Sequence, residues 1–262
     1  MPSILHRLPR NVLEELARAL FSGRIQPPYS TLALRDWLPE PELRPVLAEL
    51  ERFRIAGMTS PQIGIMVELL AHERARQQAD QDRIQVVWTG PDQEGPAVRD
   101  TGVVARELLG QAQRSLLITT FSVSRDATTF EPVKVAMERN PGLEVTLVLH
   151  VDMSKHSLYG GPAVAAFAKE FWTTKWPWPQ HPKVFFDPRG VLEHPMDRAL
   201  QHSKCIVADR DRVFITSSNY TEAGQLRNIE LGVVIQDKAL AKRVEAQFGS
   251  LIAKQMLHRL PD

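Results

Sequence analysis

A histidine and a lysine two residues apart, His202 and Lys204, carry the clearest chemical signal in this sequence. They belong to an H-x-K-x4-D octapeptide that ends at Asp209, and its apolar residues 205–208 predict a short strand. Because side chains alternate faces along a strand, His202 and Lys204 project from the same face. An imidazole can attack phosphorus, and an ammonium group can hold a non-bridging oxygen. The spacing therefore predicts a site for phosphoryl-group chemistry.

A second cluster of polar residues follows the octapeptide. Ser217 and Asn219 come after the short apolar run 213–215, and Glu230 precedes another apolar run. Both runs predict strands, and a short polar turn joins the first of them to the octapeptide's own strand. We therefore expect Asn219 and Glu230 to lie near His202 despite their separation along the chain.

The order of these residues, H-x-K-x4-D, then S-x-N, then an acidic residue, resembles the signature of the phospholipase D superfamily. One departure is visible, because Thr216 stands where the superfamily usually has glycine. A threonine at a strand end keeps the backbone extended but does not readily take a positive φ. The departure therefore concerns the local backbone and leaves the chemistry intact.

The resemblance covers roughly residues 84–255. Residues 114–124, a helix-like segment and residues 143–151 follow the strand–helix–strand order of small bacterial members of the superfamily. A closer likeness, carried by residues 87–91 and 216–223, is to the phospholipase-D-like accessory proteins of the bacterial anti-phage system DISARM.

The resemblance implies a two-step displacement that needs no metal and no other cofactor. His202 attacks the phosphodiester to form a phosphohistidine, a second histidine protonates the leaving oxygen, and water hydrolyses the intermediate. Lys204 and Asn219 bind the phosphoryl oxygens, and Lys204 supplies the charge that a metal ion supplies elsewhere. Glu230 accepts a hydrogen bond from the His202 ring and sets its tautomer.

Two further motif residues are expected to support the site without reacting. Asp209 begins a polar Asp-Arg-Asp-Arg turn, so we expect it to tie the two strands together there. Ser217 is expected to be a supporting hydroxyl.

The mechanism needs two imidazoles, but the chain carries one motif histidine. His150, His156 and His194 have no S-x-N sequence or paired lysine, and the loop pair Lys155 and His156 is better interpreted as solvated. We therefore expect a two-fold homodimer in which the two copies of His202 meet at the symmetry axis.

A near copy of the motif runs from His181 to Asp187, but it is one residue short and lacks a following S-x-N. Pro182 also removes a backbone donor beside the histidine, so we interpret the segment as an ordinary strand entry. The preceding residues 172–181 (WTTKWPWPQH) have two interpretations: an aromatic lip for nucleobases or lipid, or a packed loop over the sheet edge. We favour the packed loop.

Composition predicts a cytoplasmic globular protein with a sizeable core. Of 262 residues, 43% are hydrophobic and 24% are charged, and the formal net charge is +1. A nucleic-acid partner would therefore need a local basic surface. The single cysteine, Cys205, excludes an intrachain disulfide and fits a small buried side chain. The sequence shows neither a signal peptide nor a run of about 18 apolar residues, so we expect no stable membrane insertion.

Residues 1–80 predict an N-terminal helical region, and residues 81–262 predict a phospholipase D-like domain. Helices are expected at 11–21, 42–53, 60–78, 101–113, 132–140, 162–171 and 238–257, and strands at 84–88, 115–121, 143–151, 183–186, 205–208, 213–215 and 232–235. The fold class is therefore α/β, with a mixed β-sheet sandwiched by helices and preceded by a helical layer. The first three helices could mimic a helix-turn-helix DNA module, but balanced arginines and acids favour a packing or protein-contact layer.

The leading interpretation is a cytoplasmic, metal-independent phosphodiesterase that cleaves nucleic acid, most of all DNA, in anti-phage defence. One alternative is hydrolysis of phospholipids, for which the tryptophan-rich segment is the only local hint. Another is an accessory module that binds nucleic acid or other defence proteins with little catalysis, which the helical region motivates.

Overall fold

The computed structural model describes residues 3–91, 98–153, 158–221, 224 and 227–262. The chain divides into two compact units, Met1–Asp82 and Arg83–Asp262. Lys155 and His156 lie outside the described residues.

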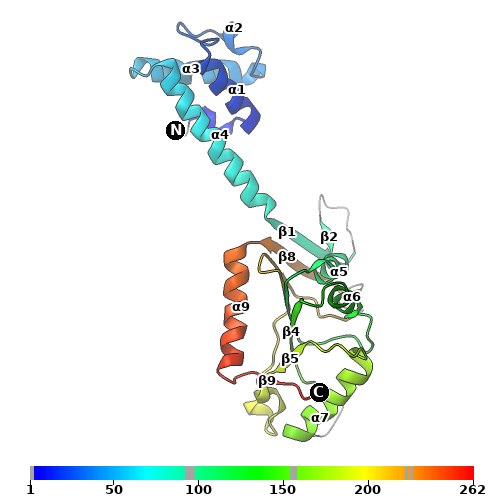
Figure 1. Cartoon of the computed structure of the whole chain (residues 1–262). Helices are drawn as coiled ribbons and strands as arrows, with labels where there is room; N and C mark the ends of the chain where they lie inside the picture. The colour runs from blue at the N-terminus through cyan, green and yellow to red at the C-terminus, as the bar shows by residue number, and fades with distance from the viewer. Residues whose placement is uncertain (1–2, 92–97, 154–157, 222–223, 225–226) are drawn as a thin grey trace. The chain divides into compact units, whose positions relative to one another are not determined.

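The first unit is helical (Figure 1). Its helices are α1 (Arg10–Phe21), α2 (Thr31–Leu34), α3 (Glu40–Ile55) and α4 (Ser60–Asp82), with a 3-10 turn at Ile4–Arg7. Leu13, Leu16 and Leu20 recur at helical spacing along α1 and are buried against Val67 and other apolar residues of the unit's own core. The expected helices at 11–21, 42–53 and 60–78 are therefore confirmed.

The second unit contains a mixed sheet. Its described strands are β1 (Ile84–Thr89), β2 (Arg99–Asp100), β3 (Ser115–Thr120), β4 (Glu144–Leu149), β5 (Lys183–Phe186), β6 (Cys205–Ala208), β7 (Arg212–Thr216), β8 (Glu230–Gln236) and β9 (His258–Arg259). They form one sheet in the order β2-β1-β8-β7-β6-β3-β4-β5-β9. Strands β3, β4 and β5 are parallel to one another, whereas β6, β7 and β8 form antiparallel pairs.

Helices lie on both faces of this sheet (Figure 1). They are α5 (Thr101–Gln111), α6 (Glu131–Arg139) and α7 (Gly160–Glu170) on one face and α9 (Lys238–Ala253) on the other. Strand β6 shows why two layers form: Ile206 packs into the cluster on the α5–α7 face, and Cys205 and Val207 pack on the α9 face. The expected α/β fold, with helices on both faces of a mixed sheet, is confirmed.

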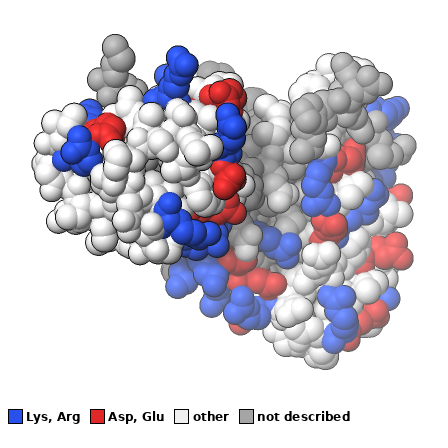
Figure 2. Space-filling model, turned by 90° about the horizontal axis from the view of Figure 1, so that it is seen from above, with Lys and Arg blue, Asp and Glu red and all other residues white. Residues whose placement is uncertain are grey.

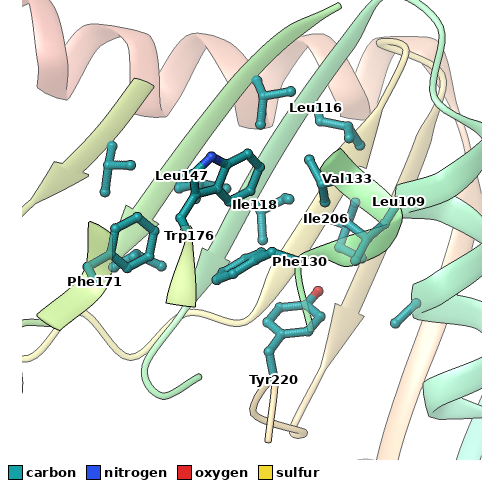
Figure 3. Packing of buried hydrophobic residues seen from close by; sticks show 14 of the residues in the cluster. Leu109, Leu116, Ile118, Phe130, Val133, Leu147, Phe171, Trp176, Ile206 and Tyr220 are labelled. Carbon is teal, nitrogen blue, oxygen red and sulfur yellow. The ribbon is translucent and has the colours of Figure 1, made fainter. Parts of the chain in front are cut away.

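The tryptophan-rich segment is packed against the core: a π-helical turn, Phe171–Lys175, follows α7 and continues into a loop. Trp176 is fully buried beside Phe130 and Phe171, as Figure 3 shows, and Trp172 and Trp178 pack against the same core. The Trp176 Nε1–H group donates to the carbonyl oxygen of Gln180 at 2.9 Å, which satisfies its buried donor. The interpretation of this segment as packed is confirmed, but the expectation of a loop holds only after Lys175.

Candidate active site

The register of the strands brings distant residues to one edge of the sheet. Thr119 in β3 pairs with Cys205 in β6, and Cys205 pairs with Ile215 in β7. Thr120 in β3 pairs with Leu149 at the end of β4. Strands β3, β4 and β7 therefore end at the edge where β6 and β8 begin. Ligands of open α/β sheets commonly bind beyond the carboxyl ends of parallel strands, which is this edge.

His202 and Lys204 lie side by side just before and at the start of β6. The Lys204 Nζ atom is 3.4 Å from Nδ1 and 3.5 Å from Nε2 of His202, and it donates to the His202 carbonyl oxygen at 3.0 Å. His202 is exposed, whereas Lys204 is only 8% exposed. Burial lowers the pKa of Lys204 from its ordinary value, and the charge of Glu230 opposes this shift. The pair presents an accessible imidazole beside a largely buried cation.

Gln201 fixes the backbone on which His202 stands. Its buried side chain donates through Nε2 to the Val148 carbonyl oxygen at 2.9 Å and accepts from the Ser203 amide at 2.7 Å. The Ser203 hydroxyl donates to Thr119 Oγ1 at 3.0 Å. These hydrogen bonds tie the start of the octapeptide to β3 and β4. The motif contains no sign of this role for Gln201, because its partners come from distant strands.

Glu230 does not make the predicted hydrogen bond to His202. Its carboxylate accepts hydrogen bonds from the Ser217 hydroxyl and, at 3.1 Å, from Asn228 Nδ2. The pairing of Ser217 with Leu231 explains this arrangement: the Ser217 amide donates to the Leu231 carbonyl, and the Leu231 amide donates to Ser217 Oγ at 3.1 Å. The serine hydroxyl is thereby placed beside Glu230. The prediction of a direct Glu230–His202 contact was wrong for a single chain, and Glu230 acts on Lys204 through its charge.

Asn219 lies just beyond the end of β7 and is partly buried. The neighbouring Tyr220 amide donates to the Ser122 carbonyl oxygen at 3.1 Å, and the Ser124 amide donates to the Tyr220 carbonyl at 2.7 Å. These bonds hold Asn219 at the same edge as His202. Its Oδ1 atom is buried and has no hydrogen-bond partner among the described residues. Buried amide groups are normally paired, so this acceptor is an exception; a phosphate oxygen would be bound by the Asn219 Nδ2 group, which donates.

Asp209, the last motif residue, lies at the opposite end of β6. Its carboxylate accepts hydrogen bonds from the backbone amides of Gln113, Arg114 and Ser115, the shortest at 2.6 Å. Its φ of 57° places it in the left-handed region, which aspartate tolerates better than most residues. The predicted role in tying the strand turn together is confirmed by these bonds, which anchor the β6–β7 turn to the start of β3.

Thr216 stays within strand β7, and its φ is not positive. Its neighbour across the β7–β8 pair is Gly232. A Cβ atom on Gly232 would lie 3.1 Å from Thr216 Cβ, 2.8 Å from Phe214 Cε2 and 2.9 Å from the Ile215 carbonyl oxygen. The space for a threonine at this position is therefore provided by the glycine opposite it.

Phe121 and His150 are site residues that the motifs did not reveal. They follow the last residues of β3 and β4, and their rings stack with centroids 4.7 Å apart. Phe121 also contacts His202, with ring centroids 5.0 Å apart. Burial lowers the pKa of His150 from its ordinary value, and His202 adds to this shift, whereas Asp152 and Asp187 oppose it. The signal that could have found both residues is their position at the carboxyl ends of adjacent parallel strands.

The near copy of the motif lies elsewhere. His181 precedes β5 and so lies at the opposite edge of the sheet from His202, where it stacks on Trp172 with centroids 4.1 Å apart. Its interpretation as an ordinary strand entry agrees with this position. Cys205 is buried, and burial raises the pKa of its thiol to about 12, so it is a packing residue.

Two features are absent from the described part of the chain. None of its His, Cys, Asp and Glu residues form a group of three or more that could hold a metal ion. No described helix is long and apolar enough to cross a membrane.

Comparison with known proteins places this site in a family. A family model described as "Cardiolipin synthase, PLD-like domain" matches residues 105–252. The DISARM protein DrmC of Bacillus paralicheniformis is 27% identical over 168 residues, which are 64% of this chain and 62% of that relative. The chain thus spans less than two thirds of the length of this curated relative.

Two solved structures were also found to be similar. One is Nuc of Salmonella typhimurium, a phospholipase D family member, with 21% identity and a TM-score of 0.43 over 68% of this chain and 98% of Nuc. The other is NucT of Helicobacter pylori, with 12% identity and a TM-score of 0.43 over 65% of this chain and 96% of NucT. Because the family model matches more than half of the chain, and because the matched segment contains the His202–Asp209 motif, the chain belongs to the PLD-like family of the phospholipase D superfamily.

Proposed function

We propose that the protein is a phosphodiesterase that cleaves nucleic acid at His202 without a metal ion. The observation that carries this proposal is the position of Lys204 Nζ, within 3.5 Å of both ring nitrogens of the exposed His202. A phosphate that meets the imidazole there also meets a cation that can neutralise one of its oxygens. The PLD-like family supports phosphodiester chemistry in general.

The reaction has two balanced steps. A His202 ring nitrogen forms a bond to phosphorus while the P–O bond to the leaving group breaks, and a second imidazole gives the leaving oxygen a proton. Water then attacks phosphorus, the N–P bond breaks, and the second imidazole takes the proton of the water. Lys204 and Asn219 hold the phosphoryl oxygens throughout. Glu230 contributes by keeping Lys204 charged and by ordering Ser217.

The second imidazole belongs to the partner subunit's His202 in a two-fold homodimer. A candidate interface lies on strands β7, β8 and β1, beside the site. Each of these strands has an exposed apolar side chain on the α9 face of the sheet: Ile215 in β7, Leu231 in β8 and Val86 in β1. They are 44%, 54% and 47% exposed. Exposed apolar patches often mark interaction surfaces, and the site has only one of the two imidazoles it needs. Both facts support burial of this patch against a second copy of the chain.

The proposed substrate is nucleic acid, and DNA is favoured over RNA. The proposed biological setting is anti-phage defence in the cytoplasm, together with other defence proteins. The likeness to a DISARM protein supports this setting. Positive and negative side chains are interspersed on the face shown in Figure 2, and the formal net charge is +1. Contact with a polyanion therefore depends on local cations around the site.

The test is cleavage of single- and double-stranded DNA and of RNA by the purified protein in the presence of a chelator. We expect cleavage by the wild type, its loss in His202→Ala, and normal cleavage by His181→Ala, the matched control in the incomplete motif. If no nucleic acid is cut, the proposal fails. Release of headgroups from liposomes would assign a phospholipid substrate instead. If His202→Ala cells resist phage as well as wild-type cells do, the protein is an accessory binding module.

A further inference from the structure

A cavity of about 720 Å³ opens beside the candidate active site. Phe121 and His150 form part of its wall, and Phe121 also contacts His202, so this ring lies between the cavity and the nucleophile. The volume is within the range of roughly 300–1,000 Å³ that is usual for small-molecule pockets. The cavity is therefore large enough for one nucleotide, next to the place where a phosphate would react.

Two arginines at this cavity, Arg125 and Arg227, are exposed. Neither arginine forms a hydrogen bond or an ion pair with another described residue. Asp126, which also lines the cavity, is different, because its carboxylate accepts a hydrogen bond from Thr128 Oγ1 at 2.6 Å. Guanidinium groups match the geometry of phosphate oxygens. Two such groups at the cavity are suited to the backbone of a strand that continues from the reacting phosphate into it.

The rest of the lining is suited to a base and a sugar. The stacked Phe121–His150 pair, with an interplanar angle of 17°, supplies an aromatic surface, and Ser122, Ser124 and Thr128 supply hydroxyl or backbone groups. Bases that are not paired can stack on such rings, whereas the bases of a duplex are already stacked on one another. Most of the lining is polar or charged, which does not suit an acyl chain.

We infer that this cavity is a binding subsite for an unpaired nucleotide adjacent to the scissile phosphodiester, and that Arg125 and Arg227 bind its neighbouring phosphates. The inference rests on the proposed function and deepens it, because it names a single strand, or an unpaired stretch, as the preferred substrate. DNA and RNA share the chemistry that the subsite recognises.

The test measures binding separately from catalysis. In the His202→Ala background, affinity for short fluorescent oligonucleotides is measured by anisotropy over a series of NaCl concentrations, with single-stranded DNA, single-stranded RNA and a hairpin duplex. The variant is Arg125→Ala/Arg227→Ala. The matched control is Arg106→Ala/Arg243→Ala, which removes the same charge from two exposed arginines outside the cavity.

The expected result is weaker binding of single strands by the cavity variant and unchanged binding by the control. The slope of log K against log salt should also fall by about 1.4, because each phosphate contact on a single strand contributes roughly 0.7. An affinity equal to that of the control, or an equal loss for the duplex, would overturn the inference. A greater loss for anionic liposomes than for single strands would reassign the cavity to lipid.

A second measurement separates this inference from the proposed function. With His202 intact, hydrolysis of bis(p-nitrophenyl) phosphate by the wild type reports the chemistry at His202, because this diester has no neighbouring phosphates for Arg125 and Arg227 to bind. If the wild type does not hydrolyse any diester while the cavity variant still loses single-strand binding, the proposed function fails and the subsite stands. If diesters are hydrolysed and oligonucleotide binding is unchanged, the subsite fails and the proposed function stands.

Discussion

Lys204 Nζ is nearly equidistant from the two ring nitrogens of His202, at 3.4 Å and 3.5 Å. The ammonium group therefore lies close to both ring nitrogens. Any phosphate oxygen near a reacting nitrogen also comes close to the ammonium group. Since Lys204 is largely buried and its pKa is lowered by that burial, its positive charge depends on its surroundings.

The charge on Lys204 predicts the alkaline limit of activity. Diester hydrolysis should fall as the pH rises through the Lys204 pKa, which lies below that of an ordinary lysine because of burial. Glu230 raises this pKa, so Glu230→Gln should lower it further and move the alkaline limb of the kcat/KM profile to lower pH. Glu245→Gln, on α9, is the control and should leave the limb in place. If the alkaline limb of Glu230→Gln were unchanged or moved to higher pH, Glu230 would not raise the pKa of Lys204.

The exposed apolar residues of β7 and β8 predict that charged substitutions on this face dissociate the dimer. Ile215→Glu/Leu231→Lys should give a monomer by light scattering, and diester hydrolysis should fall by about 10²–10⁴-fold through loss of the partner's general acid. Leu32→Glu/Ile55→Lys changes two apolar residues of the helical unit that are even more exposed, and it should leave both properties unchanged.

Mixing subunits tests the shared site directly. Heterodimers of wild type and His202→Ala should be deficient in turnover, because each contains one of the two imidazoles. A monomer with full activity would show that the site is complete in one chain. Loss of that activity in His150→Ala would then identify His150 as the second imidazole, since Phe121 contacts both rings.

The hydrogen bonds of Asp209 predict a role in stability. Asp209→Ala removes the acceptor of three backbone amides and should lower the free energy of unfolding by about 1–3 kcal/mol, measured by urea denaturation. Asp209→Asn keeps one oxygen acceptor and tolerates a φ of 57°, so its loss should be smaller. Both folded variants should keep kcat. A normal stability combined with an activity as low as that of His202→Ala would place Asp209 in the reaction.

The close packing of β7 against Gly232 predicts that a larger residue at position 232 destabilises the protein. Gly232→Ala should destabilise the protein by about 1–3 kcal/mol in urea denaturation, because the new Cβ meets the rigid Ile215 carbonyl at 2.9 Å. Thr216→Gly should not fully rescue it, since the carbonyl remains. Gly249→Ala, in α9 with nothing within 4 Å of the new Cβ, should be neutral or stabilising. Equal stability of the two alanine variants would refute this explanation.

Local patterns in the sequence were enough to predict the main elements and the closeness of His202 to Lys204. The spacing of Leu13, Leu16 and Leu20 follows the period of a helix, and the alternation at His202 and Lys204 follows that of a strand. Both spacings depend only on residues that are close together in the sequence, so they can be read from the sequence alone. The short strands β2 and β9 were missed, because two residues carry no period.

The tertiary structure decided what surrounds His202 and Lys204. Strand β6 lies between β3 and β7, and this order is not contained in any local pattern. It places Phe121 against His202, ties Gln201 to β4, and pairs Ser217 with Leu231 so that Glu230 binds the serine. Such contacts join residues far apart in the chain, and which of them form depends on how the strands pair. Residue types therefore predicted the His202–Lys204 pair, and strand order decided its supporting contacts and the neighbouring cavity.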